Sequence, residues 1–139
     1  MKNMICMIDT NILLDVLCKR APYYKDSSLI WKMCETKMIK GRVSVLSFAD
    51  IVYVLRKQLD PEQIHDILQK LTLIFEFVEL LPEDLMNASL LKWNDYEDSI
   101  QETMALRIKS DYIITRNTKD YSQSECTVLT PEQLTKILI

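Results

Sequence analysis

Four aspartates that are far apart in the chain occupy positions where α/β proteins commonly hold a ligand. Asp9 ends a short apolar segment with strand character, and Asp50 opens the helix predicted after the second strand. Asp98 opens a later helix, and Asp120 follows the strand predicted to end at Thr115. Because ligands bind outside the carboxyl ends of strands in open α/β sheets, we expect these four carboxylates to face one cleft.

Carboxylates held close together repel one another and raise each other's pKa unless a cation or hydrogen-bond donors keep them ionised. A divalent ion resolves that conflict, and Mg²⁺ or Mn²⁺ prefers oxygen ligands while keeping several waters. Such an ion can polarise a phosphoryl oxygen, activate water and stabilise the leaving oxygen. The expected cofactor is therefore Mg²⁺ or Mn²⁺, and the expected chemistry is hydrolysis of a phosphate ester.

Three of the four aspartates also have a purely local explanation. Asp50 lies three residues after Ser47, and that spacing is typical of a capping box at a helix start. Asp98 stands in the same relation to Asp95. Asp120 can belong to an ordinary surface turn, since aspartate is common in turns. These roles are compatible with metal binding and leave both interpretations open.

Asp9 is harder to explain by local structure. An acid between Ile8 and the apolar Ile12–Leu14 segment is costly to bury without partners, so its position indicates a functional role. Thr10 and Asn11 follow it directly, and residues of these types often cap a helix after a strand. We therefore expect Asp9 to be the central acid of the site.

Hydrophobic periodicity predicts an alternation of strands and helices along the chain. The predicted strands are Met4–Ile8, Arg42–Leu46, Phe75–Leu80, Tyr112–Thr115 and Thr127–Leu129. The predicted helices are Ile12–Val16, Lys25–Thr36, Phe48–Gln58, a helix from Pro61 to about Leu73, Pro82–Leu91, Asp98–Lys109 and a closing helix after Thr130. Two of these helices have an N-terminal capping signature followed by proline, at Asp60-Pro61-Glu62-Gln63 and Thr130-Pro131-Glu132-Gln133.

This alternation predicts the α/β class, with a mostly parallel central sheet in a three-layer α/β/α sandwich. Residues 1–139 are predicted to form a single domain, because the length suits one core and no linker or repeat interrupts the pattern. Gly41 is the only glycine. A glycine-rich phosphate cradle is therefore excluded, and with it the common nucleotide-cofactor motifs.

Charge and composition restrict the function further. The formal net charge of -3 excludes a broad basic surface that captures nucleic acid at long range, so a nucleic-acid role must rest on local chemistry. The four cysteines show no CxxC spacing, and the only histidine, His65, lies in another segment. Asp9 interrupts the N-terminal apolar segment before it reaches the length of a signal or spanning segment. We expect a soluble, cytoplasmic protein with no membrane partner.

Several other residues carry weaker expectations. Asp15 is expected either to support the site or to lie on the surface, and Arg116 either to meet a substrate phosphate or to be solvated. His65 falls in the polar pattern of its helix and is expected to be exposed. The aromatic residues expected in the core or at an interface, and not as base-stacking platforms, are Tyr23, Tyr24, Trp31 and Tyr53.

The N-terminal segment resembles a known family motif. Ile8–Asp15, with the sequence IDTNILLD, is similar to the opening motif of the PIN domain, in particular that of VapC-like toxin ribonucleases of bacterial toxin-antitoxin pairs. In that motif the first aspartate is a metal ligand, and the next two polar residues support it. The resemblance therefore implies that Asp9 binds the metal and that Thr10 and Asn11 orient it.

Two further segments extend the resemblance in the same order. Ser47–Tyr53, with the sequence SFADIVY, resembles the second PIN motif, whose acid is more often glutamate. Asp50 takes that catalytic position on a side chain shorter by one methylene. Asp95–Gln101 resembles the third motif and aligns Asp98 with the family's metal ligand.

Thr115–Tyr121, with the sequence TRNTKDY, resembles the fourth motif, and Asn117 and Asp120 form its polar pair. Four motifs in the correct order are specific, although none is decisive alone. The resemblance implies that the metal ligands are Asp9, Asp98 and Asp120. It implies that the catalytic acids are Asp9, Asp50, Asp98 and Asp120, supported by Thr10, Asn11 and Asn117.

The implied function is that of a Mg²⁺- or Mn²⁺-dependent endoribonuclease, a toxin that hydrolyses RNA phosphodiester bonds. The implied partners are an RNA substrate, a second copy in a homodimer and a small antitoxin that blocks the cleft. Family members usually display basic residues near the cleft. The candidates for that role are Arg20, Lys57, Arg116 and Lys119.

Three alternatives remain open. A phosphoaspartate phosphatase also carries an aspartate after its first strand, but it normally has a second one two residues later, where this chain has Asn11. A receiver-like domain needs an acidic pair that the N-terminus does not offer. A non-catalytic PIN fold acting as a binding module is the stronger alternative, and Asp50 in place of glutamate is the departure that favours it.

Overall fold

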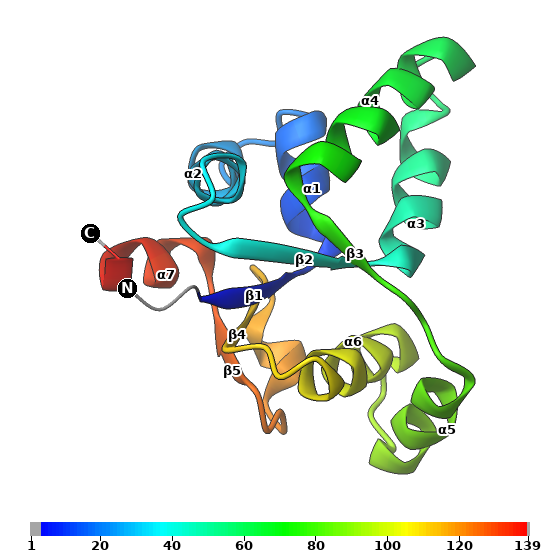
Figure 1. The fold of residues 1–139 in the computed structure, drawn as a ribbon, viewed down its shortest axis with the longest axis vertical. Helices are drawn as coiled ribbons and strands as arrows, with labels where there is room; N and C mark the ends of the chain where they lie inside the picture. The colour runs from blue at the N-terminus through cyan, green and yellow to red at the C-terminus, as the bar shows by residue number, and fades with distance from the viewer. Residues whose placement is uncertain (1–3, 139) are drawn as a thin grey trace.

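The computed structural model describes residues 4–138, in which five parallel strands lie between two layers of helices (Figure 1). The strands are β1 (Ile5–Ile8), β2 (Lys40–Ser44), β3 (Glu76–Val78), β4 (Tyr112–Ile114) and β5 (Thr127–Leu129). Their order in the sheet is β3-β2-β1-β4-β5, and each neighbouring pair is parallel. The chain thus builds the sheet outward from β1 on both sides, which confirms the predicted α/β class and parallel sheet.

Helices cover both faces of this sheet (Figure 1). Their bounds are α1 (Thr10–Leu17), α2 (Tyr24–Glu35), α3 (Val45–Leu55), α4 (Pro61–Ile74), α5 (Pro82–Leu91), α6 (Tyr96–Arg107) and α7 (Pro131–Leu138), with a 3₁₀ turn η1 (Thr118–Tyr121). Cys6 and Ile8 of β1 pack in one core with α1 to α4 and α7, whereas Met7 packs in a second core with α5 and α6. This alternation is the period of two expected of a strand buried on both faces. None of the helices described between residues 4 and 138 is both long and apolar enough to cross a membrane.

The second strand and the helix after it begin earlier than predicted. The sequence predicted a strand over Arg42–Leu46 and a helix from Phe48, but β2 ends at Ser44 and α3 starts at Val45. The Ser44 hydroxyl accepts a hydrogen bond from the Leu46 backbone N–H at 3.2 Å and so caps the helix. The apolar residues after Ser44 match the strand pattern equally well, so periodicity alone placed the boundary too late.

Both predicted capping signatures are confirmed. At α4 the Asp60 carboxylate accepts from the Gln63 backbone N–H at 2.9 Å, and the Gln63 side chain accepts from the Asp60 N–H at 3.0 Å. At α7 the Thr130 hydroxyl and the Gln133 side chain make the same reciprocal pair at 3.1 and 2.9 Å. Local side-chain chemistry therefore fixes these two helix starts without help from the rest of the fold.

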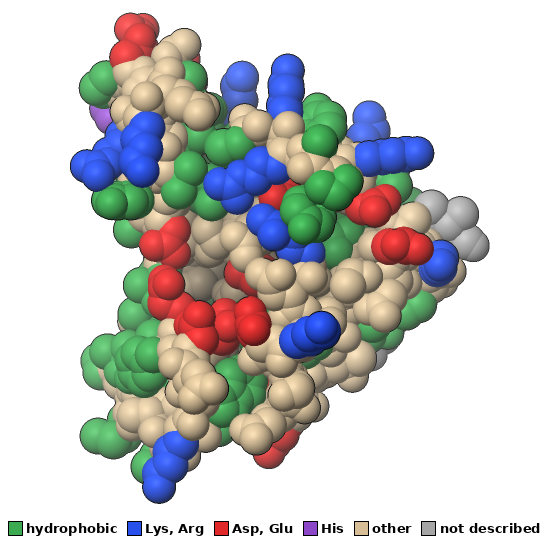
Figure 2. Space-filling model, turned by 180° about the vertical axis from the view of Figure 1, so that it is seen from behind, with side chains coloured by type: hydrophobic (Ala, Val, Ile, Leu, Met, Phe, Trp, Pro, Cys, Tyr) green, Lys and Arg blue, Asp and Glu red, His purple; other side chains and the backbone are tan. Residues whose placement is uncertain are grey.

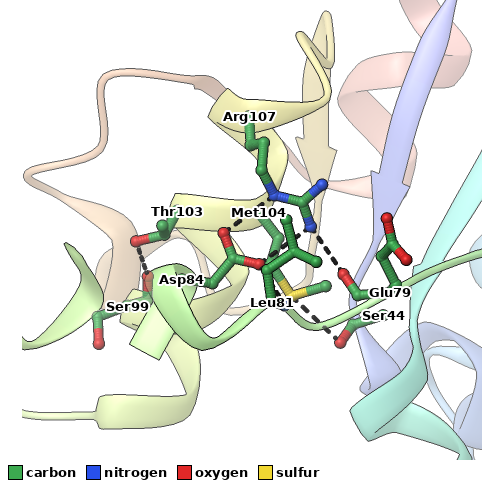
Figure 3. Close-up of polar contacts among 8 residues, drawn as sticks. All are labelled: Ser44, Glu79, Leu81, Asp84, Ser99, Thr103, Met104 and Arg107. Atoms are coloured by element: carbon green, nitrogen blue, oxygen red, sulfur yellow. Dashed lines mark hydrogen bonds and ion pairs between the residues drawn. The ribbon is translucent and has the colours of Figure 1, made fainter. Parts of the chain in front are cut away.

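A buried ion pair joins α5 to α6 on the second face (Figure 3). Asp84 is 1% exposed, and its two oxygens accept from Nε and Nη2 of Arg107, each at 3.0 Å. The Leu81 backbone N–H also donates to Asp84 at 2.9 Å, and Arg107 donates to the Glu79 carbonyl oxygen at 2.7 Å. Because α6 also carries Asp98, this pair helps to fix one of the predicted site residues.

Replacing Arg107 by alanine should lower the free energy of unfolding by about 3 kcal/mol, because the Asp84 charge stays buried without its partner. This is the lower end of the range for such pairs, since 28% of the Arg107 side chain remains in solvent. Urea unfolding followed by circular dichroism measures the change. The matched control is Lys136→Ala, which breaks an exposed pair with Glu132 and should cost no more than about 0.5 kcal/mol. Equal losses in both variants would contradict the prediction.

Candidate active site

Acidic side chains gather around a hollow of about 340 Å³ (Figure 2). The acids that line it are Asp9, Asp50, Asp95, Glu97, Asp98 and Asp120. The structure therefore brings all four aspartates selected from the sequence to one cavity, although more than 100 positions separate the first from the last. Thr10, Asn11 and Asn117, the predicted supporting residues, line the same cavity.

The topology of the sheet creates this meeting point. From β1 the chain continues to β2 and β3 on one side of the sheet, whereas from β4 it continues to β5 on the other. The carboxyl ends of β1 and β4 therefore form a switch point, where ligands usually bind. Ile8 pairs with Ile114 in the parallel register, and the Asp9 N–H donates to the Ile114 carbonyl at 2.9 Å. Asp9 and Thr115, the next residue of each strand, are consequently side by side.

Asp9 is the most buried acid of the cavity, with 9% of its surface exposed. The Thr115 hydroxyl donates to one carboxylate oxygen at 2.7 Å, and the Gln101 amide donates to the other at 3.2 Å. Burial raises the pKa of Asp9, while Thr115 and the backbone N–H groups of Thr10 and Asn11 hold that pKa partly down. The cost of burying Asp9, expected from the sequence, is thus only partly offset by neutral donors.

Asp98 faces Asp9 from α6 and is held by a different donor. The Tyr121 hydroxyl donates to its carboxylate at 3.1 Å. Burial, followed by repulsion from Asp95 and Asp9, raises the pKa of Asp98 to about 7. Asp95 does cap the helix, because its carboxylate accepts from the Asp98 backbone N–H at 3.1 Å. Only the backbone of Asp98 takes part in that cap, so its carboxylate remains available to the cavity.

Asp50 does not act as a helix cap. Because α3 starts at Val45, Asp50 lies in the second turn, and Ser47 is already inside the helix. The capping-box interpretation of Ser47 and Asp50 was therefore wrong, and so was the placement of Asp50 at the helix start. Ser47 instead exchanges a hydrogen bond of 2.6 Å with Thr10, which joins α3 to α1 beside Asp9.

Glu97 is an acid of the cavity that the sequence analysis did not select. Burial and the neighbouring Asp50 carboxylate, which lies within hydrogen-bonding range, raise the pKa of Glu97. The two acids come from α6 and α3, which are distant in sequence. The residue next to a motif aspartate carries no sequence signal of its own, so only the packing of these helices shows the pair.

Four more residues that the sequence analysis missed hold the acids in place. Thr115, Gln101 and Tyr121 donate to Asp9 or Asp98, as described above, and Ser47 holds Thr10. Thr115 also accepts from the Asn117 backbone N–H at 3.1 Å. All four belong to the segments that resemble the PIN motifs, but nothing in their type marks them as partners of a buried carboxylate.

Asp15 and Arg116 form a buried pair behind the cavity. Asp15 is fully buried, and its carboxylate accepts from Arg116 Nε at 3.0 Å and from Ser27 at 3.2 Å. The Arg116 guanidinium also lies over the Tyr23 ring, 4.1 Å from its centroid. The expectations of a surface Asp15 or a solvated Arg116 were thus wrong. The positive charge of Arg116 helps to lower the pKa of Asp9.

Three of the four aromatic residues expected in the core or at an interface lie on the surface of the chain. Tyr23, Tyr24 and Tyr53 are 42%, 40% and 56% exposed, so none of them is a core residue. Trp31 does pack inward, edge-on to Phe75 with ring centroids 5.2 Å apart. His65 is exposed, as predicted. Among the basic candidates, Lys57 lies near the Tyr53 ring, and Lys119 lines a smaller hollow with Asp95 and Asp120.

The donor set of the cavity fits a small divalent cation that prefers oxygen. Among residues 4–138, no three His, Cys, Asp or Glu side chains form a group that could hold a metal by itself. Mg²⁺ needs no such group, because it keeps several waters and binds through one or two carboxylates. Asp9 and Asp98 repel each other, and a cation bound to them would relieve that repulsion.

The model of the PIN domain matches residues 6–119, so the chain belongs to the PIN-domain family. The phosphatase and receiver alternatives are thereby removed, since they require other folds. No curated protein matches the chain in sequence.

Solved structures of VapC-type toxins share the fold. A chain of a toxin-antitoxin complex from Klebsiella pneumoniae is 20% identical, with a TM-score of 0.71 over 91% of this chain and 97% of that chain. A chain of VapBC2 from Rickettsia felis, bound to DNA of its promoter, is 18% identical, with a TM-score of 0.67 over 91% and 98%. VapC20 from Mycobacterium tuberculosis, described as a toxin that cleaves the sarcin-ricin loop, is 9% identical, with a TM-score of 0.63 over 78% and 86%. These likenesses extend the family match to the whole α/β/α architecture.

Without divalent ions, the stability of the chain should depend on pH through Asp98. Its carboxyl holds a proton up to about pH 7 in the folded state but only up to about 3.8, the ordinary value, in the unfolded state. The resulting stability is present at low pH and is lost as the pH rises through about 7. The Asp98→Asn variant should therefore gain thermal stability relative to the intact chain between about pH 5 and pH 8 in EDTA. Asp66→Asn, an exposed change on α4, serves as the control, and a pH-independent difference for Asp98→Asn would refute the expectation.

Proposed function

We propose that the chain is a metal-dependent endoribonuclease that hydrolyses RNA phosphodiester bonds. The observation that carries this proposal is the convergence of Asp9, Asp50, Glu97 and Asp98 on one cavity, with raised pKa values for three of them. Such an arrangement is electrostatically unfavourable in a merely structural site, since acids that repel one another destabilise the fold unless a cation joins them.

Asp9 and Asp98 are the proposed direct ligands of Mg²⁺ or Mn²⁺, with Asp120 and Asp50 as outer ligands that act through water. When bound, the ion would polarise a phosphoryl oxygen and lower the pKa of a water molecule. Thr115 and Gln101 orient the Asp9 carboxylate. Neutral donors of this kind fix the direction of a ligand without competing with the cation for charge.

Asp50 and Glu97 provide a second function in the same cavity. They lie within hydrogen-bonding range on facing helices, and the pKa of Glu97 is raised. When Glu97 is ionised, its raised pKa makes it a base that can accept the proton of the water that attacks the phosphodiester. Glu97 also lines the cavity, from α6.

The toxin role is proposed from the structural neighbours. Several of them are chains of VapBC or toxin-antitoxin complexes, and one is described as a toxin that cleaves the sarcin-ricin loop. We propose a cognate antitoxin that covers the acidic cavity, and RNA as the substrate. The homodimer and the cytoplasmic location inferred from the sequence stay predictions, and light scattering of the purified chain tests the first of them.

The non-catalytic binding module is the second candidate. Asp50 in place of the more common glutamate is the observation that favours it. The two candidates differ in one measurable respect, because a module of this kind has no need to turn over RNA even when it binds a divalent ion.

Purified chain should cut a structured RNA pool in Mg²⁺ or Mn²⁺ and leave it intact in EDTA. Asp9→Asn and Asp98→Asn should each lower the cleavage rate by about a hundredfold or more, because a lost metal ligand removes charge stabilisation worth several kcal/mol. Gel analysis of end-labelled RNA measures the rates. Asp66→Asn removes one acid outside the cavity and should cleave like the intact chain. Equal cleavage by all variants would disprove the assigned ligands.

Mn²⁺ should also raise the thermal midpoint of the intact chain, because a ligand that binds only the folded state stabilises it. The Asp9→Asn variant should lose most of that increase, whereas Asp66→Asn should keep it. Differential scanning fluorimetry with and without Mn²⁺ measures both. A metal response without cleavage of any RNA would favour the binding module, and no response in either assay would overturn the metal site itself.

A further inference from the structure

One exposed aromatic ring lines the acidic cavity without contributing to its carboxylates. Tyr53 lies on α3 and is 56% exposed, and it shares the cavity wall with Asp50. Residues three apart on a helix are neighbours, with Cβ atoms about 5 to 6 Å apart. A group held by Tyr53 is therefore adjacent to whatever the acids hold.

Two cations accompany this ring. The guanidinium carbon of Arg56 lies 4.2 Å from the Tyr53 ring centroid, and Nζ of Lys57 lies 5.7 Å from it. Arg56 Nε also donates to the Tyr53 carbonyl oxygen at 3.2 Å, which fixes the guanidinium beside the ring. Because more than half of Tyr53 remains in solvent although a guanidinium covers one face, the ring is supported but still accessible.

The positive charge at this position has an electrostatic consequence. The cavity is lined by six carboxylates and the chain carries a net charge of -3, so a polyanion is repelled over most of the approach. Figure 2 shows Lys and Arg side chains on the α3 and α4 side of the acidic hollow. Arg56 and Lys57 thus offer phosphate contacts at the edge of a cavity that itself offers none without a metal.

We propose that Tyr53, supported by Arg56 and Lys57, is a base-stacking platform for an unpaired nucleotide next to the phosphate that is cut. This inference rests on the proposed function and adds to it the residues that hold the substrate beside the acids. Aromatic side chains stack on bases whose faces are free, and the faces of paired bases inside a helix are not. The cations neutralise the phosphates that flank the stacked base.

The test is binding of a fluorescein-labelled single-stranded RNA of mixed sequence to the full chain in EDTA, followed by fluorescence anisotropy. Tyr53→Ala should weaken binding roughly tenfold, the change expected from loss of one base-aromatic stack. Tyr53→Phe should bind within about twofold of the intact chain, because stacking uses the ring and not the hydroxyl. Arg56→Gln should weaken binding and reduce its dependence on salt.

Two controls make the result specific. Lys32→Gln removes one positive charge from the exposed side of α2, outside the cavity, and should leave binding unchanged. A fully paired RNA of the same length should bind Tyr53→Ala and the intact chain equally. Circular dichroism and the thermal midpoint establish that each variant is folded, which is expected because Tyr53 is largely exposed.

Equal loss of affinity for single-stranded and paired RNA would overturn the platform, and so would an unchanged affinity in Tyr53→Ala. The same holds if the intact chain binds no single-stranded RNA. Failure of the proposed function is a separate result. If no metal supports cleavage but Tyr53→Ala still weakens binding, the stacking platform is supported and the proposed hydrolysis is not. If cleavage is normal but Tyr53→Ala binds like the intact chain, the hydrolysis is supported and the platform is not.

Discussion

The site is arranged around one buried group, the carboxylate of Asp9 at the carboxyl ends of the parallel strands. It is buried where β1 and β4 end, and desolvation raises its pKa. The fold surrounds it with donors from distant parts of the chain, chiefly Thr115 and Gln101. These two donors are neutral, and Asp9 and Asp98 repel each other. Within the described part of the chain, the carboxylates that line the cavity are not balanced by a cation in its lining, and a divalent ion would supply the positive charge.

Other buried acids of the same fold show what a structural carboxylate looks like. Asp84 is held by both nitrogens of the Arg107 fork, and Asp15 is paired with Arg116. Glu102, which is 1% exposed, accepts from the Ser124 hydroxyl and the Glu125 backbone N–H. Asp84 and Asp15 are thus each balanced by a cation, and Glu102 is held by two hydrogen-bond donors. These three acids stabilise the fold through their partners, whereas the acids of the cavity remain available to a ligand.

The arrangement of α3 connects catalysis to recognition. One face of this helix presents Ser47, Asp50 and Tyr53 in successive turns, so a hydrogen bond to α1, an acid and an exposed ring all follow from one helical register. That register depends on Ser44 ending β2 and capping the helix. A start at Phe48, as periodicity suggested, would leave Ser47 outside the helix and away from the face that carries Asp50 and Tyr53. Two or three residues at a boundary thus decide the form of the cavity wall.

The sequence alone determined the α/β class, the two capped helix starts at Asp60 and Thr130, and the four aspartates of the cavity, because periodicity, capping chemistry and motif order are local properties. Tertiary structure decided the rest. The pairing of Glu97 with Asp50 and the donors to Asp9 join residues far apart in the chain, and no local pattern encodes such distances. Tyr53 is the clearest example of what the sequence does not determine, since a tyrosine at this position fits the pattern of the helix whether its side chain is buried or exposed. Only the packing of α3 against its neighbours leaves its ring in solvent beside the acids.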